Sequence, residues 1–99
     1  MARVRITVVK KAFYADLAEK YENPATEPCE LQVGQQFVSE NGEKPQGMCA
    51  NAWATLAPFV QELARGGGNF YGDWMLNPHS AVLSCNDEVR PVSFLLENG

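Results

Sequence analysis

The stretch RVRITVV, residues 3–9, alternates polar and apolar side chains near the start of the chain. Its apolar members, which share one side of an extended backbone, are Val4, Ile6 and Val8. This period of two predicts a half-buried β-strand. One face of the sheet that contains it therefore covers a core, and the other face meets water or a partner.

A helical period follows at residues 49–63. The apolar positions on one side of that helix are Cys49, Ala52, Trp53, Leu56, Phe59, Val60 and Leu63. Pro58 conflicts with this pattern, because a proline inside a helix removes a hydrogen bond and costs about 3 kcal/mol. We expect either a kink near residues 54–58 or two short helices, the second with Pro58 in its first turn.

The remaining patterns predict shorter elements. A helix of about two turns is expected in residues 13–22, with Tyr14, Leu17, Ala18 and Tyr21 on one side, and Asn23-Pro24 ends it. A loop with two prolines, Pro24 and Pro28, follows over residues 22–34. The other expected elements are a strand in residues 35–40 with Phe37 facing inward, a turn at Asn41-Gly42, and a closing hairpin of residues 81–85 and 92–96.

The predicted order is β-α-β-α-β-β. This order indicates an α+β fold, a two-layer sandwich with helices packed on one face of a mainly antiparallel sheet. The 99 residues fit a single domain, 1–99, which needs no disulfide or metal to stay folded.

Composition excludes several classes of function. The formal net charge is −4, and the basic residues are scattered except for Arg3, Arg5, Lys10 and Lys11, which argues against a nucleic-acid partner. No apolar run approaches the roughly 20 residues of a membrane helix, and no signal-peptide core is present, so we expect a cytoplasmic protein without a membrane partner. Three widely spaced cysteines in such a protein are expected to be reduced thiols.

Cys49 has three interpretations. It packs as a small apolar residue at the start of the helical stripe, it ligates a metal or cluster, or it is a redox or nucleophilic thiol favoured by the helix dipole. If Cys29, Cys49 and Cys85 converge, they form a candidate site for zinc or an iron–sulfur cluster, with His79 or solvent as the fourth ligand. No C-x-x-C pair supports that site. His79 is also a candidate base for Cys49, although a solvated loop histidine is more common.

The segment RGGGNFYGDWMLNPHS, residues 65–80, is the longest irregular stretch, and its length is typical of a lid, a binding loop or a disordered stretch. Trp53 lies one helical turn from Cys49, and Phe70, Tyr71 and Trp74 would either close over that patch or complete a small core. The candidate ligand pocket therefore comprises Cys49, Trp53, Phe70, Tyr71, Trp74 and Arg90. Arg90 would hold an anionic ligand or pair with Asp73, Asp87 or Glu88.

Four stretches together, PCELQVGQQF, PQGMCANAWATL, GGGNFYGDW and CNDEVRPVSFLLE, resemble a family of small uncharacterised prokaryotic cytoplasmic proteins of about this length. The family pattern has a Pro-Cys loop, a Gly-x-Cys before a Trp-containing helix and a closing Cys-x-Asp-Gly-x-Arg-Pro-Val hairpin. The matching positions are Cys29, Gly34, Phe37, Gly47, Cys49, Trp53, Gly67, Trp74, Cys85, Asp87, Arg90 and Pro91. Ser84-Cys85 stands where the family has Cys-Cys, and Asp87-Glu88 where it has Asp-Gly. The resemblance implies the location of a site and no activity.

Two functions of different classes follow. The leading hypothesis is a small module whose cysteine-lined pocket binds a metal or small ligand or senses redox state. The alternative is a structural or protein-interaction module, a homodimer or accessory subunit in which the cysteines only pack. An enzyme with Cys49 as nucleophile is the weakest hypothesis, because the sequence assures no base.

Overall fold

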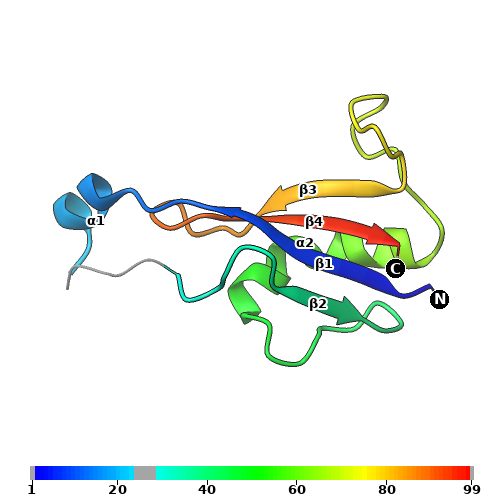
Figure 1. Cartoon of the computed structure of the whole chain (residues 1–99), viewed down its shortest axis with the longest axis horizontal. Coiled ribbons are helices and arrows are strands. Elements are labelled where there is room, and N and C mark those ends of the chain that lie inside the picture. The colour runs from blue at the N-terminus through cyan, green and yellow to red at the C-terminus, as the bar shows by residue number, and fades with distance from the viewer. Residues whose placement is uncertain (1, 24–28, 99) are drawn as a thin grey trace.

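The computed structural model describes residues 2–23 and 29–98, and these form four strands and two helices in the predicted order (Figure 1). The elements are β1 (Val4–Lys11), α1 (Ala15–Tyr21), β2 (Gln36–Ser39), α2 (Ala50–Ala64), β3 (Ser80–Ser84) and β4 (Val92–Asn98). The α+β class is therefore confirmed. Pro24 and Pro28 of the predicted loop lie outside the described residues.

The four strands form one antiparallel sheet in the order β2-β1-β4-β3. β1 lies inside the sheet, and its Ile6 stands opposite Phe37 of β2 and Leu96 of β4. Residues directly opposite each other share a face, so these side chains point to the same side. We call that side, which faces α2, the inner face of the sheet.

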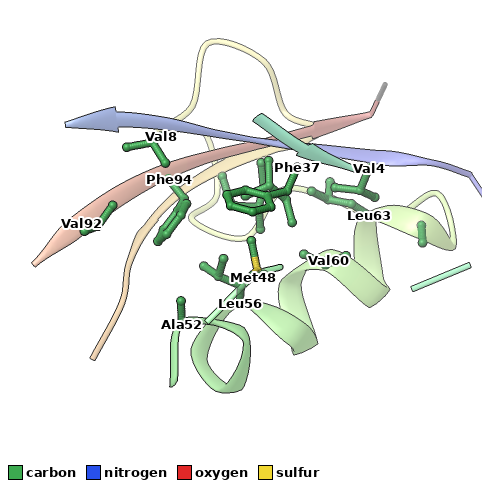
Figure 2. Packing of buried hydrophobic residues seen from close by; sticks show 14 residues of the cluster. Val4, Val8, Phe37, Met48, Ala52, Leu56, Val60, Leu63, Val92 and Phe94 are labelled. Carbon is green, nitrogen blue, oxygen red and sulfur yellow. The ribbon is translucent and has the colours of Figure 1, made fainter. Parts of the chain in front are cut away.

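α2 covers the inner face and contacts β1, β3 and β4. Leu56, Val60 and Leu63 are fully buried in a core shared with the strands, and Figure 2 shows their side chains directed at the sheet. Met48, just before the helix, joins the same core. The alternation of residues 3–9 and the helical stripe of residues 52–63 thus meet in a single apolar layer.

α1 lies beyond the end of the sheet, away from the core (Figure 1). Ala18 is buried, but Tyr14 is 43% exposed and Tyr21 71% exposed. The expectation that both tyrosines belong to a buried apolar side of this helix is therefore wrong. Their spacing is helical, but the helix does not lie on the core, so the two rings have no apolar surface to pack against.

A β-bulge interrupts the pairing of β1 with β4. The register shifts between Val8 and Lys10, and Val9 is left outside the ladder and exposed. After the bulge Lys11 stands opposite Val92, which is buried on the inner face. Bulges re-aim side chains. Here the extra residue places Lys11, rather than Lys10, on the side of α2.

α2 runs without a break through Pro58, so the expected alternative of two short helices is wrong. Pro58 and Ala54 are both exposed, and the carbonyl that Pro58 leaves without a donor lies on the solvent side. The helix ends at Ala64, and the chain then turns at Gly66, whose φ of +91° suits glycine. The N–H groups of Gly66 and Gly67 donate to carbonyls of the last turn.

We predict that Pro58→Ala raises the free energy of unfolding. Alanine restores the missing N–H and suits a helix interior, a gain of up to about 3 kcal/mol that is offset by roughly 0.4–1 kcal/mol of lost rigidity in the unfolded chain. Denaturant unfolding followed by circular dichroism measures the difference.

Leu56→Ala, two positions away, is the matched control. Leu56 is fully buried, so this change lowers the free energy of unfolding by about 2–5 kcal/mol. A Pro58→Ala variant that is less stable than the natural chain would contradict the solvent-facing placement of Pro58.

Candidate functional site

A pocket of about 430 Å³ lies at one end of the sheet and is lined by all three cysteines. Its walls come from the segment after residue 28, the residues at the start of α2 and the β3–β4 connection. Its floor is formed by the buried Ala52 of α2 and by Val92 and Phe94 of β4. The lining residues are Cys29, Glu30, Leu31, Cys49, Asn51, Ala52, Cys85, Asp87, Arg90, Val92 and Phe94. Segments far apart in the sequence therefore bring their thiols to one cavity.

Lys11 holds the Cys29 segment in place. Its Nζ donates to the carbonyl of Leu31 at 2.8 Å and to the carbonyl of Cys29. This reach depends on the bulge in β1, which turns Lys11 toward the inner face. Cys29 and Leu31 are half-buried against the edge of the core. The charged side chain of Lys11 thus fixes the position of this loop by hydrogen bonds to its carbonyls.

Cys49 is the N-cap residue of α2, with φ −58° and ψ 130°. Its carbonyl accepts the first helical hydrogen bond, from Trp53, at 3.0 Å, and its side chain makes no capping hydrogen bond. The residue is exposed at the pocket. The expectation that Cys49 packs into the core is therefore wrong, because the buried stripe of the helix begins one turn later, at Ala52.

Cys85 is held by its own hairpin. Its N–H donates to the carbonyl of Val92 at 3.0 Å, and its Sγ accepts the N–H of Val92 at 3.4 Å. The side chain is half-buried beside the core. This thiol is tied to the floor of the pocket by backbone geometry.

Asp87 and Arg90 form a compact ion pair at the rim. Arg90 Nε lies 2.7 Å from Asp87 Oδ2, while Asp87 Oδ1 accepts the N–H groups of Val89 and Arg90 at 3.0 and 3.2 Å. The hydrogen bond from the guanidinium holds the pKa of Asp87 below its ordinary value of 3.8, and the backbone donors act in the same direction. Arg90 Nη2 also lies 3.7 Å from Glu22 Oε1. The predicted pairing of Arg90 with Asp87 is present.

The metal hypothesis does not fit this geometry. Within residues 2–23 and 29–98, no three His, Cys, Asp or Glu side chains are arranged so that they could hold a metal ion. His79 lies at the other end of β3, where its Nδ1 is 3.2 Å from the carbonyl oxygen of Gly67. The candidate set of Cys29, Cys49, Cys85 and His79 is therefore not assembled as ligands for zinc or an iron–sulfur cluster.

The aromatic residues of the candidate pocket lie elsewhere. Phe70 packs edge-on against Phe59, with ring centroids 5.1 Å apart, and Tyr71 stacks on Trp74 at 5.9 Å. These contacts are in the loop that projects where β3 begins, at the opposite end of the sheet from the β3–β4 connection (Figure 1). Trp53 is half-buried on the core and does not line the pocket. The expected closure of this loop over Cys49 is wrong.

The neck of that loop is closed by backbone contacts. The N–H of Asn69 donates to the carbonyl of Pro78 at 2.7 Å. A Cβ at position 68 would collide with the same carbonyl, so glycine is required there. Gly68 therefore serves a close approach of two backbone segments, while Gly66 serves the end of α2.

Sequence reasoning missed several residues that line the pocket and also Lys11, which does not line it but positions the Cys29 segment. The available signal was Val9, an apolar residue out of phase with the alternation of residues 3–9, which is what a bulge leaves behind. Leu31, Asn51 and Phe94 carried no chemical signal, because their role comes from where the segments meet.

No protein-family model, no curated protein and no solved structure matches this chain. The family resemblance drawn from the four sequence stretches stays a prediction.

We predict that the Asp87 carboxylate stabilises the fold only above its own pKa. Because that pKa is lowered in the folded state, its contribution is complete above 3.8 and is lost as the pH falls through the folded value. Asp87→Asn keeps an oxygen for the two backbone N–H groups and removes the charge. The difference in unfolding free energy between the natural chain and this variant should therefore shrink as the pH falls below 3.8.

Glu88→Gln, which removes a neighbouring exposed carboxylate, controls for the loss of one negative charge. A stability difference for Asp87→Asn that stays constant from neutral pH down to strong acid would contradict the ion pair with Arg90.

Proposed function

We propose that this chain is a small cytoplasmic module that binds a small molecule in the three-cysteine pocket. The observation that carries the proposal is the convergence of Cys29, Cys49 and Cys85 on one cavity of about 430 Å³. Ligand pockets are commonly about 300–1,000 Å³, largely apolar and provided with a few polar groups. This pocket has those properties.

The chemistry of the lining favours a neutral, largely apolar ligand. Ala52, Val92 and Phe94 are buried core residues that form the floor. Thiols are weakly polar and polarisable, so they suit apolar or aromatic surfaces better than charged groups. The guanidinium of Arg90 is already engaged by Asp87 and Glu22, which reduces its attraction for an anion. The polar groups at the rim therefore serve to orient a bound ligand rather than to attract it by net charge.

Other functions receive less support. The histidine that would serve Cys49 as a base, His79, lies at the opposite end of the sheet, so a cysteine–histidine enzyme lacks its geometry. All four arginines form ion pairs with carboxylates, at Glu40, Glu97, Glu62 and Asp87, which works against a nucleic-acid surface. No helix in the described residues is long and apolar enough to cross a membrane.

A second candidate function is a protein-interaction module, and a specific observation favours it. Trp74 is 81% exposed and Leu76 fully exposed on the projecting loop. The stacked Tyr71 and the closed neck hold the loop in shape, so it presents these side chains at little conformational cost. A homodimer or a complex with another protein would bury them.

We predict that indole, a neutral flat probe, binds the pocket weakly, with a dissociation constant of roughly 1 mM. Titration followed by ¹⁵N–¹H spectra should show saturable shifts of the amides of Ala52, Val92 and Phe94, because these residues form the floor.

Cys49→Trp places a large ring at the exposed rim and should abolish those shifts. Val82→Trp, on the outer face of the sheet, adds the same ring away from the pocket and should leave them unchanged. Shifts concentrated in residues 65–79 instead would contradict the pocket and favour the interaction function.

The homodimer form of the second function predicts a dimer in sedimentation that Leu76→Ser converts to a monomer, since this change removes apolar area only from the projecting loop. Val82→Ser, which removes apolar area from the outer sheet face, is the control. A natural chain that sediments as a monomer at all concentrations would contradict the homodimer.

A further inference from the structure

Cys29 and Cys49 face the same two cavities. Besides the main pocket, a second hollow beside it is lined by Cys29, Glu30, Leu31, Gln35, Gly47 and Cys49. The Cys29 segment thus forms one wall of this hollow, and the residues before α2 form the other. Cys85 lines only the main pocket, whereas Cys29 and Cys49 line both cavities.

The three sulfurs differ in their bonding. Cys85 Sγ accepts a backbone N–H, whereas within the described residues Cys29 and Cys49 have no side-chain hydrogen bond. Cys49 is exposed and Cys29 is half-buried. A reagent from solution therefore has readier access to Cys49 than to Cys29.

Arg90 and Cys29 both line the main pocket. The pKa of Arg90 is raised mainly by its hydrogen bond with Asp87, and the charge of Cys29 contributes in the same direction. The thiolate is the species that attacks a disulfide.

The backbone on the Cys29 side can adjust. Cys49 is fixed at the start of α2, but residues 29–33 belong to no helix or strand and are held by Lys11 and by the edge packing of Cys29 and Leu31. Backbone pairing with β1 resumes only at Gly34 and Gln35, which bond with Val8. Disulfide formation requires Cα atoms about 4.4–6.8 Å apart, and this segment is the one able to supply the approach.

We propose that Cys29 and Cys49 form a reversible disulfide that closes the pocket, through exchange with a low-molecular-weight disulfide. The control of ligand access in this proposal rests on the proposed ligand-binding function, whereas the formation of the disulfide does not. The closed loop would link the Cys29 segment to α2 across the mouth of the cavity, so the redox state of the surroundings would control access of the ligand. Intracellular disulfides are commonly of this transient, regulatory kind.

The reaction balances in two exchange steps. The Cys49 thiolate attacks one sulfur of the small disulfide, forms a mixed disulfide and releases one small thiolate. The Cys29 thiolate then attacks the Cys49 sulfur of the mixed disulfide, which forms the Cys29–Cys49 bond and releases the second small thiolate. The two protons of the protein thiols go to the released thiolates, so the protein is oxidised by two electrons and the small disulfide is reduced by two.

The test treats the reduced, folded protein with oxidised glutathione, blocks the remaining thiols with N-ethylmaleimide and measures the intact mass. The natural chain should lose two hydrogens and retain a single alkylated cysteine. A protease that cleaves after glutamate places Cys29, Cys49 and Cys85 in residues 23–30, 44–62 and 63–88, so the linked pair is read directly from the fragments.

Variants separate the outcomes. Cys85→Ser should still form the internal disulfide, whereas Cys29→Ser should stop at the glutathione adduct of Cys49, and Cys49→Ser should form no internal bond. A stable adduct on the natural chain, or a bond that includes Cys85, would overturn the proposal. Indole binding to the reduced protein is measured separately. If indole binds but the internal disulfide does not form, the redox proposal is wrong and the ligand-binding function stands. If the disulfide forms but indole does not bind, the ligand-binding function is wrong and the disulfide chemistry stands.

Discussion

The packing of α2 on the inner face of β1 and β4 is the contact on which the other features depend. Leu56, Val60 and Leu63 occupy the groove between strands whose inward side chains include Ile6, Phe94 and Leu96, and all six are fully buried. Burial of each such side chain contributes about 1.5–3 kcal/mol, compared with about 0.5–1.5 kcal/mol for a typical hydrogen bond between neutral groups. Because the buried stripe begins at Ala52, the cap residue Cys49 is carried just past the edge of the core. The helix therefore presents a thiol at the point where its apolar stripe stops.

The bulge in β1 connects this packing to the pocket. A regular strand would leave Lys10 in phase with Val8, and the lysine that follows would point to the outer face. The extra residue at Val9 instead puts Lys11 opposite Val92, on the side of α2, where it binds the carbonyls of the Cys29 segment. The local break in the ladder thus positions a loop that has no strand pairing of its own in residues 29–33. As a result of this bulge, the apolar side chain of Val9 faces outward and is exposed.

Sequence patterns predicted those elements whose side chains alternate or repeat against a single core. The alternation of Val4, Ile6 and Val8 and the spacing of Leu56, Val60 and Leu63 report directly on burial, so β1 and α2 were found with nearly their observed bounds. The same logic failed for Tyr14 and Tyr21, because a helical period says nothing about whether a surface is available to cover it. For the aromatic loop the alternative of closure over Cys49 is wrong, whereas Phe70 and Tyr71 pack against the core, as the other alternative had it, and Trp74 is exposed. The spacing of the three cysteines in the sequence could not predict whether they converge, and the tertiary arrangement shows that all three line one pocket.

The three thiols are held by three different kinds of constraint, and this difference determines which wall of the pocket moves. Cys85 is fixed by two hydrogen bonds with Val92, one between backbones and one from the Val92 N–H to its Sγ, and Cys49 by the first turn of a helix that is itself packed on the sheet. In the described residues, the Cys29 segment belongs to no helix or strand and is held by the Lys11 side chain and by the packing of Cys29 and Leu31 at the edge of the core. A side-chain contact to a loop carbonyl is weaker and more easily exchanged with water than a ladder or a packed helix. Any opening or closing of the cavity therefore belongs to the Cys29 wall, while the floor and the Cys49 wall stay with the core.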